Sequence, residues 1–198
     1  MTTDAEFWDK IFSEGQKYRP LKDEELDAII ARTGMPKTAA DIGAGTGNLV
    51  LALAARGIRT TAFDISNVAL QKILQTADER GVTEHITTVQ ADLNDPIFGQ
   101  DHERAFDIVF MKLAVAFAEK REQVLRRIKE MLHAKGFLII ITPVLLENGD
   151  YDERQARISV PRAEFEHELH NLFSDVQVFS EGGEDPHWPL VTYICRNA

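Results

Sequence analysis

The feature that most constrains the fold of this chain is a repeated alternation of two apolar patterns. From Ala39 onward, short apolar runs of strand length alternate with longer stretches whose apolar residues recur at helical spacing. This alternation is typical of strands joined by crossover helices, which build a parallel sheet. The sequence therefore predicts a Rossmann-like, doubly wound α/β fold. Its seven strands are expected at 38–42, 58–63, 86–90, 106–111, 136–142, 173–180 and 189–195.

Helices are predicted between these strands and before the first one. Gly57, Gly81 and Gly136 are expected to end three of the crossover helices. The connection 180–188 is rich in turn residues and too short for a helix, so the last strand should return antiparallel to its predecessor. The crossover helices are expected at 47–56, 68–80, 122–133 and 161–172, and an amino-terminal helical annex at 4–13 and 23–32.

Chain length and composition favour a single core. The chain has 198 residues, of which 44% are hydrophobic, which is enough for one well-packed domain and short for two. The sequence contains no internal repeat and no low-complexity tract that would mark a boundary. We therefore expect one domain over residues 1–198, with a helical cap at 1–36 and the Rossmann-like core at 37–198.

Charge and cysteine content disfavour several partners. The 22 basic and 32 acidic residues give a net charge of −10, which disfavours nucleic acid as a partner. The single cysteine, Cys195, allows no intrachain disulfide and no cysteine cluster for zinc or iron–sulfur, and no metal site is expected. The first ten residues are acidic and amphipathic, unlike a signal peptide, and no segment approaches a membrane-spanning length. A cytoplasmic protein without a membrane partner is expected.

Three glycines mark the junction between the first strand and the next helix. Residues 40–47 read Ala-Asp-Ile-Gly-Ala-Gly-Thr-Gly. Glycine permits the positive φ angles of a sharp turn and lets backbone N–H groups approach a ligand, while the helix N-terminus favours an anionic group such as a carboxylate or a phosphate. A dinucleotide fingerprint would have its third glycine at position 48, which is Asn48, whereas the third glycine here is Gly47.

An acidic residue followed by this glycine spacing resembles the first motif of the class I S-adenosylmethionine-dependent methyltransferases. The closing antiparallel hairpin is also typical of that family and distinguishes it from ordinary dinucleotide-binding folds. The resemblance implies that the glycine loop contacts the methionine part of the cofactor and that the acidic residue orients its ammonium group. The residues that match these roles are Asp41, Gly43, Ala44, Gly45 and Gly47.

Two further strand ends extend the resemblance. Asp64 ends the second strand 21 residues after Gly43, where a carboxylate can accept hydrogen bonds from ribose hydroxyls, and Ile65 follows it as a second cofactor contact. A carboxylate at this position is shared with NAD enzymes. By the resemblance, Asp92 takes the adenine amino group and Leu93 packs on the ring. For each residue alone, turn chemistry or helix capping is the alternative interpretation.

The remaining candidates lie at the fourth strand, the last hairpin and the amino terminus. Met111 ends the fourth strand and, by the resemblance, should border the sulfonium. His187 is the only histidine expected at the carboxyl edge of the sheet, so it is a candidate general base, against an ordinary loop residue. Tyr18 and Trp8 precede the first strand, where small methyltransferases of this family often have a segment that covers the cofactor; packing on the domain is the alternative for Trp8.

The sequence thus predicts an enzyme that transfers a methyl group from S-adenosylmethionine to a small-molecule acceptor by in-line displacement and releases S-adenosylhomocysteine. Residues 110–113, Phe-Met-Lys-Leu, depart from the pattern of adenine-base methyltransferases. In the long connection 142–162, Arg154, Arg157 and Arg162 are either solvated charges or contacts for an anionic acceptor. Two other classes stay open: a nicotinamide-dependent oxidoreductase, and a non-catalytic protein that binds the cofactor. The acceptor atom and the oligomeric state, including a homodimer, are also left open.

Overall fold

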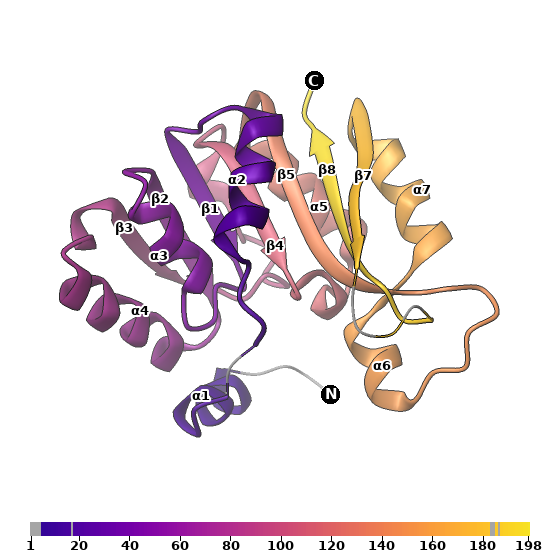
Figure 1. Cartoon of the computed structure of the whole chain (residues 1–198), viewed down its shortest axis with the longest axis horizontal. Helices are drawn as coiled ribbons and strands as arrows, with labels where there is room; N and C mark the ends of the chain where they lie inside the picture. Colours follow the sequence, from indigo (N-terminus) through magenta and orange to yellow (C-terminus); the bar gives the residue numbers. More distant parts are fainter. Residues whose placement is uncertain (1–4, 17, 183–184, 186) are drawn as a thin grey trace. The chain divides into compact units, whose positions relative to one another are not determined.

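The computed structural model describes residues 5–16, 18–182, 185 and 187–198. The chain divides into two compact units, Met1–Asp95 and Pro96–Ala198, and each contains its own set of paired strands (Figure 1). Among the described residues, no helix is long and apolar enough to cross a bilayer.

The first unit is a parallel three-stranded sheet with helices packed on it. Its strands lie in the order β3-β2-β1. Thr38 of β1 pairs with Arg59 of β2, and Thr60 of β2 pairs with Ile86 of β3, both in parallel. Helix α3 packs on β1 and β2, and α4 packs on β2 and β3. The elements are α1 (Ala5–Ser13), α2 (Asp23–Thr33), β1 (Thr38–Ile42), α3 (Asn48–Ala54), β2 (Arg59–Asp64), α4 (Asn67–Arg80), the 3-10 turn η1 (Thr83–His85) and β3 (Ile86–Gln90).

Local signals set the ends of α4 and its packing. The Ser66 hydroxyl accepts a hydrogen bond from the Ala69 N–H at 3.1 Å and caps the first turn. The helix ends at Gly81, whose φ of 66° is left-handed and favours glycine. Between these ends, Leu70 and Ile73 are buried with residues of α3 and β2, and each such side chain stabilises the fold by about 1.5–3 kcal/mol.

The second unit is a mixed four-stranded sheet with a short extra strand. Its strands lie in the order β4-β5-β8-β7, and β6 pairs with β5. β4 and β5 are parallel, whereas β8 is antiparallel to both β5 and β7. The elements are the 3-10 turn η2 (Gln100–His102), β4 (Phe106–Lys112), the 3-10 turn η3 (Val115–Phe117), α5 (Arg121–Met131), β5 (Leu132–Leu145), α6 (Glu153–Ile158), β6 (Val160–Pro161), α7 (Arg162–Leu172), β7 (Asp175–Gly182) and β8 (Leu190–Arg196).

The predicted fold class is confirmed: an α/β sheet, mostly parallel, with antiparallel strands at its carboxyl-terminal end. Each of the seven predicted strands is present, and their bounds agree within two residues except at β5. Helices α1 and α2 form the predicted annex, and the second ends at Gly34. Asp4, the predicted first residue of α1, lies outside the described residues, as do three residues of the connection 180–188.

Two predictions about the second unit differ from the structure. Gly136 does not end a helix, because α5 stops at Met131 and the chain enters β5 directly at Leu132. A Cβ on Gly136 would lie 3.0 Å from the carbonyl oxygens of Asp107 and His133, so glycine is needed there for close approach of the backbone. The connection 142–162 contains α6 and β6, so the described residues form eight strands rather than seven.

Candidate functional site in the first unit

The glycine loop follows β1 and is built from left-handed backbone. Gly43, Gly45 and Gly47 have φ angles of 73°, 52° and 77°. The N–H groups of Gly43 and Ala44 both donate to the Phe63 carbonyl oxygen, at 2.9 and 3.1 Å, which fixes the loop to the end of β2. The loop therefore carries no side chain at three positions and is held rigidly at the carboxyl edge of the sheet, where ligands bind in parallel α/β folds.

Gly47 has a packing role besides its turn geometry. It is buried as the first residue before α3, and a Cβ there would lie 2.5 Å from Cγ1 of Ile73 in α4. Ile73 is fully buried, so it has little room to move away. Position 47 thus sets how closely the loop approaches α4.

Asp64 is the buried carboxylate of this edge. It ends β2, and its side-chain oxygens accept hydrogen bonds from the Gly45 N–H at 2.7 Å and from the Ser66 N–H at 2.8 Å. Burial raises the pKa of the Asp64 carboxyl above its ordinary value of 3.8, and the same two backbone hydrogen bonds oppose that rise. Asp41, at the end of β1, is also buried, with 3% of its surface exposed.

The ends of β2 and β3 are tied together. The Ala91 N–H donates to the Asp64 carbonyl oxygen at 3.0 Å, and the Gln90 amide donates to the Ile65 carbonyl oxygen at 3.1 Å. Asp92 and Leu93 follow directly and are half-buried, and the Asp92 carboxylate accepts a hydrogen bond from the Asn94 N–H at 2.8 Å. The structure thus brings the predicted residues of the glycine loop, β2 and β3 to one edge of the first unit.

Helix α1 lies against the same edge (Figure 1). Phe12 is its buried residue, and its ring would lie 3.3 Å from a Cβ placed on Gly45. Trp8 stacks on Phe12 with ring centroids 5.8 Å apart. Tyr18 meets Phe12 edge-on at 6.4 Å and remains 43% exposed. The two predicted cover residues therefore surround Phe12, and Phe12 itself makes the contact with the loop.

Asp9 of α1 was missed by sequence reasoning. Its Oδ1 accepts hydrogen bonds from the Ser66 hydroxyl at 2.6 Å and from the Val68 N–H at 3.1 Å. These partners follow Asp64 in the chain and are 57 and 59 residues from Asp9. No local pattern in the sequence signals such a distant pair.

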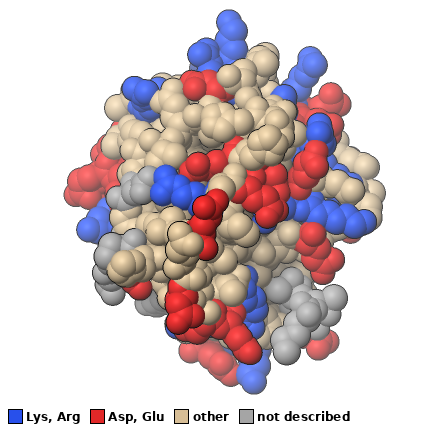
Figure 2. Space-filling model, turned by 90° about the vertical axis from the view of Figure 1, so that its right-hand side faces the viewer, with Lys and Arg blue, Asp and Glu red and all other residues tan. Residues whose placement is uncertain are grey.

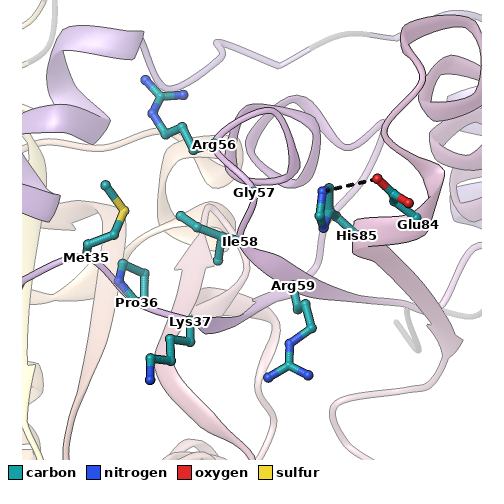
Figure 3. Close-up of a pocket in the computed structure, with 9 residues that line it drawn as sticks. All are labelled: Met35, Pro36, Lys37, Arg56, Gly57, Ile58, Arg59, Glu84 and His85. Atoms are coloured by element: carbon teal, nitrogen blue, oxygen red, sulfur yellow. Dashed lines mark ion pairs between the residues drawn. The ribbon is translucent and has the colours of Figure 1, made fainter.

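A cavity in the described part of the first unit lies at the opposite edge of its sheet. It has a volume of about 520 Å³ and is formed at the amino ends of the three strands (Figure 3). His85 lies in its wall 3.7 Å from Glu84, and Arg56 is bound by Asp23 and Asp27 of α2. Glycine-loop residues do not line this cavity, so it is separate from the candidate site. Its lining residues are Met35, Pro36, Lys37, Arg56, Gly57, Ile58, Arg59, Glu84 and His85.

The second unit holds the other two predicted residues. Met111 is fully buried in β4, and Leu113 just after that strand has a left-handed φ of 57°. His187 is exposed in the turn before β8, where its N–H donates to Asp185 at 2.8 Å. Tyr151 was not predicted: its hydroxyl donates to the His187 carbonyl oxygen at 2.8 Å and accepts from a backbone N–H of the chain after β5 at 2.7 Å.

Comparisons with known proteins identify the family and the fold. A family model described as a methyltransferase domain matches residues 40–140, more than half of the chain. A search of curated protein sequences gave no significant match. Among solved structures, the YcgJ protein from Bacillus subtilis is 13% identical with a TM-score of 0.74, over 89% of this chain and 99% of that one.

Two other solved structures show the same fold. Geranyl diphosphate C-methyltransferase from Streptomyces coelicolor A3(2), crystallised with Mg²⁺, geranyl diphosphate and S-adenosylhomocysteine, is 12% identical with a TM-score of 0.70, over 98% of this chain and 96% of that one. TehB from Haemophilus influenzae is 15% identical with a TM-score of 0.68, over 96% of this chain and 67% of that one.

The chain belongs to the methyltransferase domain family. It is a class I S-adenosylmethionine-dependent methyltransferase, as its sequence predicted. The predicted family, cofactor and type of reaction are therefore confirmed. The alternative of a nicotinamide-dependent oxidoreductase is not supported.

Proposed function

We propose that this methyltransferase acts on a small-molecule acceptor and holds its cofactor at the carboxyl edge of the first unit. The observation that carries the proposal is the buried Asp64 carboxylate bound to the Gly45 N–H of the glycine loop. The carboxylate suited to bind ribose hydroxyls is thereby hydrogen-bonded to the loop suited to bind the amino-acid end of the cofactor.

The residues present fit such a cofactor. The positive φ angles of the three glycines leave the loop free of side chains, so backbone N–H groups can approach a carboxylate. A carboxylate offers about four acceptor positions, and Asp64 retains capacity for a hydroxyl besides the hydrogen bonds from Gly45 and Ser66. When bound, the cofactor supplies an activated methyl group on a sulfonium.

We assign the other roles by the family resemblance. Asp41 is proposed to orient the ammonium group, while Asp92 and Leu93 hold the adenine, with Ile65 beside the ribose. Their half-buried or buried positions at one edge support these roles. The remaining proposed contacts are Gly43, Ala44, Gly47, Met111 and Tyr18.

His187 is the proposed general base on the acceptor side. Its backbone is fixed on both sides by the hydrogen bonds of its N–H to Asp185 and of its carbonyl oxygen with Tyr151, while the side chain stays exposed. An exposed imidazole on a backbone held in this way is chemically suited to act as a general base. The in-line displacement itself needs alignment and exclusion of water more than covalent chemistry.

Charge and fold relatives support a small acceptor. On the face shown in Figure 2, which is the α6 and α7 side of Figure 1, Lys and Arg side chains are interspersed with Asp and Glu, unlike the clustered positive charge of a nucleic-acid surface. Geranyl diphosphate is the small substrate named for one relative, and another, the N-terminal domain of EvdMO1, was crystallised with D-fucose. A cytoplasmic location and a single functional domain over residues 1–198 are further parts of this proposal, which leaves the oligomeric state open, a homodimer included.

Calorimetric titration with S-adenosylhomocysteine and NAD tests the cofactor site. We expect S-adenosylhomocysteine to bind and NAD not to bind, and Asp64→Ala to weaken that binding at least about tenfold, since it removes a charged acceptor. Asp78→Ala is the matched control, because Asp78 is an exposed acid on neighbouring α4. Unchanged affinity in Asp64→Ala would contradict the assigned ribose role.

Methyl-donor turnover over a panel of small metabolites tests the acceptor class. We expect turnover with at least one of them, and His187→Ala should lower kcat much more than it lowers cofactor affinity. Cofactor binding without turnover on any metabolite would favour the non-catalytic binding protein. Unchanged turnover in His187→Ala would remove His187 as the base.

A further inference from the structure

Helix α1 depends on a small number of contacts. It has nine residues, and isolated helices shorter than about 12–15 residues are marginal in water. Among its described residues Phe12 is the one fully buried, and Trp8 and Ile11 are half-buried, so its apolar packing on the first unit is limited. Its polar contacts therefore add to this packing in holding α1 on the first unit.

Those polar contacts converge on the start of α4. Oδ1 of Asp9 accepts from the Ser66 hydroxyl at 2.6 Å and from the Val68 N–H at 3.1 Å. It thus satisfies an N–H at the α4 N-terminus, where negative charge is favourable. Lys72 of α4 also donates to the Phe12 carbonyl oxygen. Helix α1 is bound to α4 at both of these points.

The turn at Ser66 also orients the Asp64 carboxylate, which the proposed function assigns to the ribose of the cofactor. Ser66, which donates its hydroxyl proton to Asp9, donates its N–H to Asp64 at 2.8 Å. On the other side, the Phe12 ring lies against Gly45, whose N–H also donates to Asp64. Helix α1 therefore touches both structures that the proposed function assigns to the cofactor.

We propose that Asp9 is a positioning residue that holds α1 over the glycine loop, so that α1 covers the cofactor and slows its release. This inference rests on the proposed cofactor site. A ligand on the loop would lie beside the Phe12 contact, and in this proposal α1 loosens at Asp9 before the ligand leaves, as segments that cover active sites do. Asp9 acts through Ser66 and α1 and needs no contact with the reacting atoms.

The two tryptophans of the chain allow a direct test. Trp188→Phe leaves Trp8 of α1 as the only tryptophan. In that background, iodide quenching of Trp8 fluorescence measures whether α1 is docked, and stopped-flow displacement measures the release rate of S-adenosylhomocysteine. The variants are Asp9→Ala, Asp9→Asn, which keeps an acceptor oxygen, and Glu6→Ala, which removes an exposed charge from the same helix.

We expect Asp9→Ala to increase quenching of Trp8 and to speed release of S-adenosylhomocysteine about tenfold, the effect of losing one charge-assisted acceptor. kcat at saturating cofactor should change little. Asp9→Asn should restore most of the slow release, and Glu6→Ala should match the parent. Far-UV circular dichroism verifies that the variants remain folded.

Three results would overturn the proposal, and they are distinguishable. Unchanged quenching in Asp9→Ala would show that Asp9 does not hold α1. Increased quenching with unchanged release would show that α1 is held but does not cover the cofactor. If the Trp188→Phe parent binds no S-adenosylhomocysteine at all, both the proposed cofactor site and the proposed covering role of α1 are wrong.

Discussion

The steric role of Gly47 can be isolated from its backbone role. Gly47 and Gly57 have nearly the same left-handed φ, 77° and 75°. A Cβ on Gly57 would meet nothing within 4 Å, whereas a Cβ on Gly47 would meet Cγ1, Cδ1 and Cγ2 of Ile73 at 2.5, 2.9 and 3.2 Å. Alanine at 57 therefore introduces backbone strain alone, and alanine at 47 introduces strain and overlap.

The expected magnitudes follow from these two contributions. A left-handed residue with a Cβ costs about 1–2 kcal/mol, which is the expected loss of unfolding free energy in Gly57→Ala. Overpacking of a close-packed interior costs about 1–3 kcal/mol more, so Gly47→Ala should lose about 2–5 kcal/mol. That is a large part of a domain stability of about 5–15 kcal/mol.

A double-mutant cycle measures the overlap itself. Ile73→Ala removes all three overlapping atoms and should cost about 2–5 kcal/mol alone, because it opens a cavity at a fully buried position. In that background, Gly47→Ala should cost only about 1–2 kcal/mol, like Gly57→Ala. Urea denaturation followed by circular dichroism gives the four free energies. Equal losses for the two glycine variants, or an undiminished loss in the Ile73→Ala background, would refute the steric argument.

Three further predictions concern ionisation, strain and thiol access. Burial raises the pKa of Asp64 above 3.8, so the native protein binds a proton there more readily than the unfolded protein does. The contribution of Asp64 to folding stability should therefore fall as pH rises from 3.8 through the raised pKa. The proposed ribose role of Asp64 uses the charged form, so S-adenosylhomocysteine binding should weaken as pH falls through that raised pKa. Calorimetry from pH 8 to 4 checks this, and an identical profile for Asp64→Asn would contradict it. Lys135 is exposed with a left-handed φ of 65°, so Lys135→Gly should raise the unfolding free energy by up to about 1 kcal/mol in urea titrations, and a loss of stability would count against strain at this position. Burial raises the pKa of the Cys195 thiol well above its ordinary value, so a thiol reagent should modify the native protein far more slowly than the urea-unfolded protein; equal rates would mean that β8 opens readily.

The arrangement of residues at the carboxyl edge of the first unit was predictable from sequence because its signals are local. The first two strands have an aspartate at or next to their last residue, Asp41 and Asp64. A glycine turn or a helix cap follows each aspartate within a few residues. Such signals depend on backbone conformation within one turn, and the structure brings these residues together as expected. The same reasoning predicted the antiparallel return of β8 from a connection too short for a helix.

Contacts between distant residues could not be predicted in the same way. Asp9 and Ser66 are 57 residues apart, and Tyr151 and His187 are 36 apart, so each pair depends on tertiary packing. The prediction that Gly136 ends a helix was wrong because glycine is common both at helix ends and where backbone segments approach closely. Helix α6 did leave a local signal, since Asp152 and Gln155 form a reciprocal capping box.

The shared hydrogen bonds of Asp64 limit how this enzyme can be re-engineered. One carboxylate accepts hydrogen bonds from both the Gly45 and the Ser66 N–H groups. A library that varies position 64 to alter nucleoside preference therefore also changes the hydrogen bonding of the glycine loop and of the start of α4. Glutamate, one methylene longer, cannot keep both amides in place without shifting the backbone. Tolerance at this position should therefore be low even when variants are selected only for folding. On the roles proposed above, a new nucleoside preference is better sought at Leu93 or Ile65, whose side chains carry no such hydrogen bonds.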